Sequence, residues 1–407
     1  MGQNKQKKRK KWIRARHRAV RNLLYVVLKP YSRLKYGIKV DRFAEQEKRP
    51  YLILLNHQTP FDQFFVGMAF RGPIYYMATE DIFSMGFVSS LIRYLVAPIP
   101  IKKQTTDVKA IMTCLRVAKE GGTIAIAPEG NRTYSGRTEY MSPSIVPLAR
   151  KLGMPIALFR IVGGYGVEPR WSDVVRKGKM HAYVSRVISP EEYAEMSDDE
   201  LFALIRDGLY VDEAVCDGEF YHKKSAEYLE RAVYVCPFCG LSSFESHGDR
   251  IMCKTCQREI RYLPTKELEG VGFDFPYRFV AEWYDAQKDF MNALDLSEYA
   301  ERPMYEEYGD LYEVIPYEKK KLLCERIAIS LYGNRIEIAA DGETTVWPFE
   351  KTSAVVVLGR NKLNVYFDGR IYQIKADKRF NALKYVHTYH RCKNIAKGEK
   401  HEQFLGL

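Results

Sequence analysis

The chain has 407 residues, 46% of them hydrophobic, and a formal net charge of +12. A chain of this length and hydrophobic content is expected to form two or three domains with buried cores, which excludes a disordered protein. The charge is uneven, because residues 1–50 contain seventeen Lys or Arg against three Asp or Glu and the rest is close to neutral. A protein that is basic over its whole surface is therefore excluded.

Residues 1–48 form a basic segment with helical periodicity. Its apolar positions share one face and basic positions flank that face: Ile13, Val20, Leu24, Val27, Leu28 and Tyr31 are apolar, and Lys11, Arg14, Arg18 and Arg21 are basic. This pattern is typical of a helix lying in a membrane interface, so we expect contact with an anionic membrane surface. One alternative is a solvated basic tail followed by a helix that packs on the body. Contact with nucleic acid is a further, less favoured alternative.

The first 48 residues also bear on localisation. No stretch reaches the roughly 18 to 20 apolar residues of a spanning helix, and no cleavage site of a signal peptide follows the basic start. We therefore expect peripheral attachment at the cytoplasmic face of the cell membrane.

Residues 49–190 alternate apolar strands with helical stretches. The expected buried strands are 51–55, 74–78, 97–101, 123–127 and 156–162. This alternation predicts an α/β domain with a largely parallel sheet flanked by helices. In such sheets ligands gather at the carboxyl ends of the strands.

A four-cysteine module follows a helical, charged connector at residues 191–232. Residues 233–264 contain C-x2-C-x13-C-x2-C, which is formed by Cys236, Cys239, Cys253 and Cys256. Two such pairs supply the four thiolates of a closed structural Zn²⁺ site, whereas a redox dithiol is the less favoured alternative. The module is expected to be a zinc ribbon in which the metal replaces part of a core.

The last third of the chain changes to a period of two. Residues 265–318 are expected to be a linker with one helix. Residues 319–395 show short β runs separated by Gly-Asn, Asp-Gly and Gly-Arg-Asn turns, followed by a helix. This antiparallel β domain with a C-terminal helix resembles a pleckstrin-homology-like (PH-like) domain in topology.

A histidine and an aspartate follow the first strand of the α/β domain, in the segment LLNHQTPFDQFFVG. Thr59 is expected to cap a helix that has Pro60 at its first position. The turn between strand and helix would let His57 fold back onto Asp62 as a general base and the carboxylate that orients it. Taken alone, the segment is equally compatible with a helix cap and a histidine at the end of a strand.

A second polar cluster, PEGNRT, ends the expected strand 123–127. It brings Glu129, Gly130, Asn131 and Arg132 together. An arginine beside a glycine at the end of a strand suits a phosphate group, and Glu129 could position that arginine or accept a substrate hydroxyl. A surface Glu–Arg pair in a turn is the alternative.

The two clusters in this order resemble the motifs of the glycerolipid acyltransferase family, which includes bacterial 1-acylglycerol-3-phosphate acyltransferase. NHQTPFD resembles the first motif and PEGNRT the third; APIPIKK and IVPLARKLGMPI stand where the second and fourth fall. The resemblance covers about residues 20–190. The second motif usually ends in an acid followed by a basic residue, and here Lys102 and Lys103 take those places.

The resemblance implies an enzyme that moves a fatty acyl group from acyl-CoA or acyl carrier protein to the free hydroxyl of lysophosphatidic acid, giving phosphatidic acid. It implies that His57 and Asp62 are catalytic and that Glu129, Gly130, Asn131, Arg132 and Lys103 bind the acceptor. Another lysophospholipid or a glycolipid as acceptor is an alternative. A catalytically idle zinc-ribbon protein associated with a membrane or with nucleic acid is another.

Overall fold

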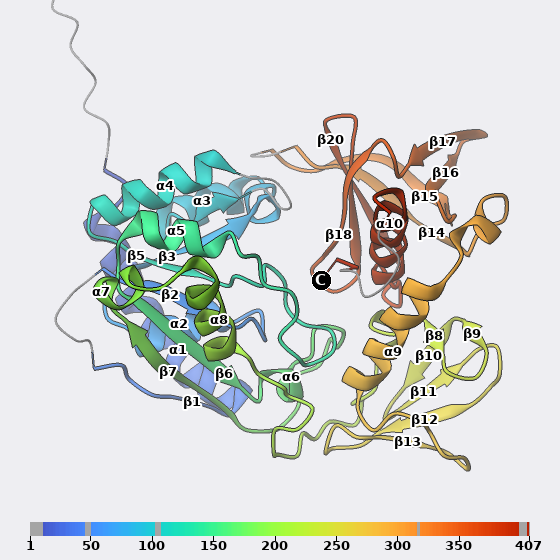
Figure 1. Cartoon of the computed structure of the whole chain (residues 1–407), viewed down its shortest axis with the longest axis horizontal. Helices are drawn as coiled ribbons and strands as arrows, with labels where there is room; N and C mark the ends of the chain where they lie inside the picture. The colour runs from blue at the N-terminus through green and yellow to red at the C-terminus, as the bar shows by residue number, and fades with distance from the viewer. Residues whose placement is uncertain (1–10, 45–49, 102–106, 316–317, 399–404, 407) are drawn as a thin grey trace, which may run out of the picture.

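The computed structural model describes residues 11–44, 50–101, 107–315, 318–398 and 405–406. A mixed seven-stranded sheet forms the centre of the N-terminal half (Figure 1), with the strand order β1-β7-β6-β2-β5-β3-β4. Its strands are β1 (Ile38–Val40), β2 (Leu52–Leu55), β3 (Ile74–Thr79), β4 (Ile99–Ile101), β5 (Thr123–Ile126), β6 (Ile156–Val162) and β7 (Met180–Ile188). Every pairing is parallel except that of β6 with β7. The predicted α/β fold is confirmed.

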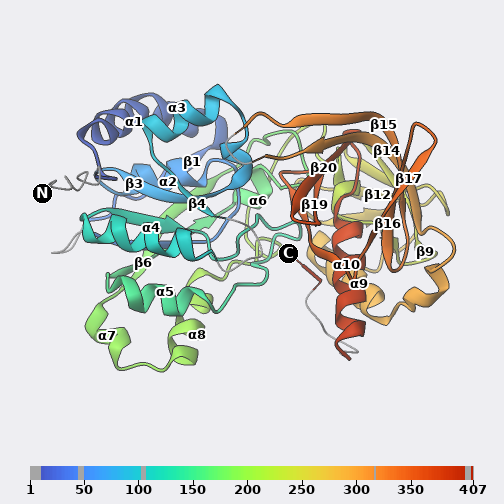
Figure 2. The same ribbon diagram turned by 90° about the horizontal axis from the view of Figure 1, so that it is seen from above.

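Helices cover both faces of this sheet (Figure 2). They are α1 (Ala15–Tyr36), α2 (Asp62–Ala69), α3 (Phe87–Leu95), α4 (Val108–Lys119), α5 (Ile145–Leu152), α6 (Gly164–Val167), α7 (Pro190–Ala194), α8 (Asp198–Leu209) and the 3-10 helix η1 (Glu80–Phe83). Because side chains alternate along a strand, β2 serves two cores. Leu52 and Leu54 pack in the core with α4, α5 and α8, and Ile53 packs in the core with α1 and α2.

The four-cysteine region forms small antiparallel sheets beside a long helix. Its elements are the 3-10 helix η2 (Leu229–Arg231), β8 (Val235–Cys236), β9 (Gly240–Leu241), β10 (Phe244–His247), β11 (Arg250–Cys253), β12 (Glu259–Tyr262), β13 (Leu268–Gly270), α9 (Val280–Ala293) and η3 (Leu296–Tyr299). The connector that precedes it is helical only as far as Leu209, and residues 210–228 form no helix. The prediction of a helical connector over residues 191–232 is therefore correct only for its first part.

A curled seven-stranded antiparallel sheet with a helix packed on it ends the chain. Its elements are β14 (Tyr305–Glu313), β15 (Lys321–Leu331), β16 (Arg335–Ala340), β17 (Glu343–Pro348), β18 (Thr352–Leu358), β19 (Lys362–Phe367), β20 (Arg370–Ala376) and α10 (Leu383–Ala396). The strand order is β17-β16-β15-β14-β20-β19-β18. The first strand lies before residue 319, in the region expected to be a linker, so the C-terminal β domain begins at Tyr305.

The cysteine region and the C-terminal β domain share one hydrophobic core. That core contains Cys253 and Ile260 of the cysteine region, Trp283 of α9 and Ile329 of β15, and it also reaches Trp171 of the α/β domain. The indole N–H of Trp283 donates to the carbonyl of Val235 at 2.7 Å, which ties α9 to the first cysteine pair. The ribbon is thus a part of a larger body in this structure and not a separately packed module.

Helix α1 packs on the body and also exposes apolar side chains. Tyr36 is buried against Phe61 and Phe65, and the predicted face at Val20, Leu24 and Leu28 is only half-buried. Of the other predicted face positions, Val27 is 58% exposed and Tyr31 is 41% exposed. Further strongly exposed apolar side chains are Leu23 (67%), Val26 (69%) and Leu34 (88%) on α1, and Phe87 (81%) and Tyr94 (58%) on the adjacent α3. Within the described residues, no helix is long and apolar enough to cross a bilayer.

Candidate active site

His57 and Asp62 meet in the turn between β2 and α2. The imidazole Nδ1 lies 2.7 Å from Asp62 Oδ2. Asp62 is 1% exposed, and its carboxylate also accepts from the backbone N–H of Gln58 at 2.7 Å and from the hydroxyl of Thr59 at 2.8 Å. Because only donors surround Asp62, Nδ1 carries the hydrogen of that contact and Nε2 is the nitrogen that can take a proton.

Helix α2 begins two residues later than the sequence predicted. Its first residue is Asp62, and Thr59 makes no side-chain cap to the helix. The Thr59 hydroxyl accepts from the backbone N–H of Phe61 and donates to Asp62. Asp62 in turn accepts from the backbone N–H of Thr59 at 3.0 Å. The aspartate therefore closes the turn itself, and the same carboxylate orients His57.

Glu129 lies beside this pair and does not contact Arg132 as the sequence suggested. Its Oε1 accepts from the backbone N–H of His57 at 2.9 Å, and its Oε2 is buried without a partner. Burial raises the pKa of Glu129 to about 8, against the opposing effect of the bond from His57. The carboxyl is therefore mostly protonated at neutral pH and could donate a hydrogen bond.

Arg132 faces the same site from the segment that follows β5. Its Nη1 is buried and makes no hydrogen bond, and among the described residues no carboxylate pairs with it. Burial, together with Arg170 and Arg360, lowers the pKa of Arg132 to about 10, so the guanidinium stays charged. A half-buried arginine that has one buried, unpaired nitrogen and no paired carboxylate is a ready site for an anion.

Two more of the predicted acceptor residues, Gly130 and Asn131, lie in the turn after β5. Gly130 has a φ of +70° in the turn, where a side chain would be strained, and it leaves open space around its Cα. Asn131 is half-buried beside it. Lys103 lies outside the described residues.

The α/β domain is similar to known acyltransferases. The Acyltransferase family model matches residues 38–161, which include His57, Asp62 and the PEGNRT segment. A curated relative, 1-acyl-sn-glycerol-3-phosphate acyltransferase of Bacillus subtilis (strain 168), is 23% identical over 193 residues, covering 46% of this chain and 90% of that protein. The α/β domain, which the family model matches, is therefore an acyltransferase domain. The family match ends before the cysteine region.

Two solved structures also match. One is the 1-acyl-sn-glycerophosphate (LPA) acyltransferase PlsC of Thermotoga maritima, with 21% identity, a TM-score of 0.39, and coverage of 48% of this chain and 80% of that one. The other is the N-terminal PH domain of human ARAP2, with 16% identity, a TM-score of 0.20, and coverage of 24% of this chain and 88% of that one.

The candidate site has buried polar neighbours that the sequence did not single out. Gln58 is 1% exposed, and both polar atoms of its amide are buried without partners beside His57. Glu168, from the end of α6, accepts from Tyr36 of α1 at 2.9 Å and from Arg360 of the C-terminal β domain at 2.6 Å. Gln58 stands inside the first motif and could have been proposed. The partners of Glu168 are far away in the sequence, so no local pattern could have identified it.

The four predicted metal ligands come together in the acyltransferase's cysteine region. The Sγ atoms of Cys236, Cys239, Cys253 and Cys256 all lie within 4.8 Å of one another. The Sγ atoms of Cys236 and Cys256 are 3.7 Å apart, and those of Cys239 and Cys253 are 3.6 Å apart. Four thiolates about 2.3 Å from a tetrahedral Zn²⁺ would lie about 3.8 Å apart, whereas a disulfide requires about 2.05 Å. The donor set therefore fits Zn²⁺.

Proposed function

We propose that the protein transfers a fatty acyl group from an acyl thioester to the free hydroxyl of a lysophospholipid, with lysophosphatidic acid as the acceptor. The observation that carries this proposal is the 2.7 Å contact between His57 and Asp62, set beside Arg132, whose Nη1 is buried without a hydrogen-bond partner. A base for a hydroxyl and a cation for a phosphate are what such an acceptor requires.

The proposed chemistry needs no nucleophile from the protein. Nε2 of His57 takes the proton of the acceptor hydroxyl as its oxygen attacks the thioester carbonyl carbon. The tetrahedral intermediate then collapses, the C–S bond breaks, and the imidazolium returns the proton to the departing thiolate. Asp62 holds the imidazole in place and stabilises its positive charge.

The protonated Glu129 and the guanidinium of Arg132 are proposed to bind the acceptor. Arg132 can offer two parallel N–H donors to a phosphate, and this would fix the distance between the phosphate and the reacting hydroxyl. Acyl-CoA and acyl carrier protein are both proposed donors. The four-thiolate site is proposed to hold a structural Zn²⁺, because four cysteine ligands leave no open position for a reactant.

Peripheral binding to the cytoplasmic face of the cell membrane is also proposed, through α1 and α3. Leu23, Leu34 and Phe87 are exposed on these helices, and the basic side chains of Arg14, Arg18, Arg33 and Lys35 are exposed on α1. Apolar side chains among basic ones suit an anionic bilayer surface. Helix α1 also contacts Phe61 in the turn that carries His57, so a bilayer on this side would lie close to the site.

The test is an assay of thiol release with purified full-length protein and palmitoyl-CoA or palmitoyl-acyl carrier protein. Each donor is paired with lysophosphatidic acid, lysophosphatidylglycerol or lysophosphatidylcholine, and the product is identified by mass. Turnover is expected with lysophosphatidic acid in preference to the others. No turnover with any lysophospholipid would overturn the proposal, and a preference for another acceptor would replace the substrate while keeping the chemistry.

A further inference from the structure

A cavity of about 390 Å³ lies where the acyltransferase domain meets the C-terminal β domain. Pro60 and Arg132 line it from the acyltransferase domain, with Pro60 three residues after His57. The β18–β19 turn, residues 359–361, lines it from the β domain, together with Lys362 of β19, Lys375 of β20, and Lys378 just after β20. This volume lies within the range of small-molecule sites, about 300 to 1,000 Å³. We refer to it as the interdomain cavity.

The interdomain cavity is strongly cationic. Its lining contains Arg132, Arg231, Arg360, Lys362, Lys375 and Lys378, and the one carboxylate among its lining residues is that of Asp173. Arg231 and Arg360 pair with Asp173, and Arg360 also pairs with Glu168 behind the lining. These acids neutralise only part of the charge, so the lining keeps an excess of positive charge that suits an anionic ligand.

Two of these cations have buried nitrogen atoms without partners. Nη1 of Arg132 and Nε of Arg360 make no hydrogen bond. Leaving a buried donor of a charged group unpaired is unfavourable, so an anion bound beside these two arginines would be stabilised. The unpaired donors and the positive charge of the lining both indicate an anionic ligand.

The β18–β19 turn is held firmly against the acyltransferase domain. Arg170 donates from Nε to the carbonyl of Gly359 at 2.9 Å. The hydroxyl of Tyr134, two residues beyond Arg132, donates to the carbonyl of Arg360 at 2.7 Å. Arg360 completes the contact through Glu168. The segment that carries Arg132 and the turn that carries Arg360 are therefore fixed relative to each other.

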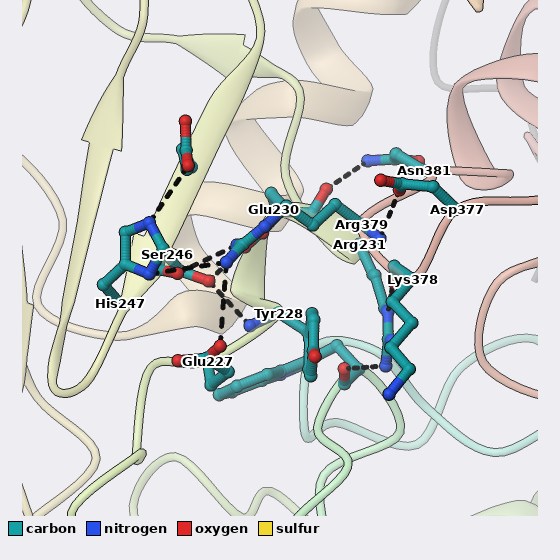
Figure 3. Close-up of polar contacts among 12 residues, drawn as sticks. Glu227, Tyr228, Glu230, Arg231, Ser246, His247, Asp377, Lys378, Arg379 and Asn381 are labelled. Atoms are coloured by element: carbon teal, nitrogen blue, oxygen red, sulfur yellow. Dashed lines mark hydrogen bonds and ion pairs between the residues drawn. The ribbon is translucent and has the colours of Figure 1, made fainter. Parts of the chain in front are cut away.

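The segment that carries Lys378 is anchored as well (Figure 3). Arg231 donates from Nε to the carbonyl of Lys378 at 2.6 Å. The neighbouring Arg379 pairs with the buried Glu230 and donates to the carbonyl of Ser246 at 2.8 Å. Residues of η2 and β10 thus hold the main chain of Lys378 in place while its side chain stays exposed at the cavity.

We propose that the C-terminal β domain completes the headgroup site of the acceptor, and that the interdomain cavity selects a headgroup bearing a doubly charged phosphate monoester over a zwitterionic one. This proposal rests on the proposed function. In lysophosphatidic acid the free hydroxyl and the phosphate can stand on neighbouring carbons, so a phosphate at Arg132 keeps the hydroxyl near His57. The phosphates of coenzyme A lie at the far end of a long arm from the thioester, which favours the acceptor as the source of the phosphate.

The test is isothermal titration of the full-length protein, without acyl donor, using monomeric hexanoyl lysophosphatidic acid. The test variant is K375Q/K378Q, which alters two exposed side chains. The matched control is K351Q/K397Q: both lysines are exposed in the same domain, and Lys351 lies at the other end of β18 from the cavity. Two phosphate-facing charges are removed, so K375Q/K378Q should raise the Kd about five- to thirtyfold, which corresponds to about 1 to 2 kcal/mol.

Several outcomes decide the matter. The control should change the Kd less than about twofold, K375R/K378R should retain wild-type binding, and hexanoyl lysophosphatidylcholine should bind weakly and be unaffected. An unchanged Kd of K375Q/K378Q for lysophosphatidic acid would overturn the proposal, as would a loss confined to coenzyme A. Because binding is measured without donor, lysine-dependent binding by an inactive protein would instead refute acyl transfer and leave the cavity assignment standing.

Discussion

Replacing Asp62 by asparagine tests the role assigned to this carboxylate without removing its shape. Oδ2 accepts from His57 Nδ1 and from the N–H of Gln58, whereas Oδ1 faces the N–H and the hydroxyl of Thr59. Of these four donors, only the hydroxyl can turn to accept instead. The new amide nitrogen should therefore face Thr59, and the new carbonyl should keep the contact with His57.

The imidazole orientation is then preserved in D62N and the negative charge is lost. Two unit charges 4 Å apart interact by about 4 kcal/mol at an effective dielectric constant of 20. Because the imidazolium forms only during the reaction, most of that energy should be missing from the transition state. We expect kcat to fall about 10²- to 10³-fold with little change in the KM for lysophosphatidic acid.

The chain offers a matched control for this substitution. Asp41 and His181 form a second pair, with a separation of 2.7 Å, but both side chains are substantially exposed. Initial rates of thiol release from palmitoyl-CoA should therefore be unchanged in D41N. A kcat of D62N within about threefold of the wild type, in protein with a native circular-dichroism spectrum, would refute the assigned role.

Three further predictions concern stability, metal and membrane. Burial raises the pKa of Glu129 from its ordinary value of 4.5 to about 8. Between these pH values the unfolded chain has lost the proton and the folded chain still holds it. The free energy of unfolding should therefore fall as pH rises from about 4.5 to about 8, by at most about 5 kcal/mol. E129Q should remove this pH dependence of stability. The same decrease in Tm from pH 5 to pH 8 in E129Q and in the wild type would contradict it. Purified protein should contain one Zn²⁺ per chain and C253S should contain none, whereas C324S should keep the metal; a metal-free wild type that melts normally would exclude the four-thiolate site. L23D/L34D should weaken binding to vesicles containing phosphatidylserine at least about tenfold. V215D/Y308D, at exposed apolar positions elsewhere, should not weaken it. Equal binding by the two variants would show that α1 does not contact the membrane.

Local sequence patterns correctly predicted those elements whose conformation does not depend on long-range packing. Strands β2 and β5 are buried on both faces and appear in the sequence as uninterrupted apolar runs, which is why they were located within a residue or two. The cluster of four cysteines was predictable because the spacing of two C-x2-C pairs alone indicates a four-thiolate metal site. The proximity of His57 to Asp62 was predictable because the strand turns into a helix over only six residues, 56–61.

Long-range packing produced the features that the sequence did not reveal. Strand β7 exposes residues on one face and pairs antiparallel with β6, so it lacks the continuous apolar run of its neighbours. The Gly-Arg-Asn turn at residues 359–361 has the composition of any hairpin turn. Its contact with Tyr134 spans 226 positions in the chain, and no local periodicity encodes such a contact.

The most direct test of the account compares H57A with H181A in single-turnover acyl transfer from palmitoyl-CoA to lysophosphatidic acid. A general base within hydrogen-bond reach contributes about 10²- to 10⁴-fold, so H57A should lose at least about 10²-fold in rate, and H181A should match the wild type. A wild-type rate for H57A would contradict the central claim that His57 deprotonates the acceptor hydroxyl.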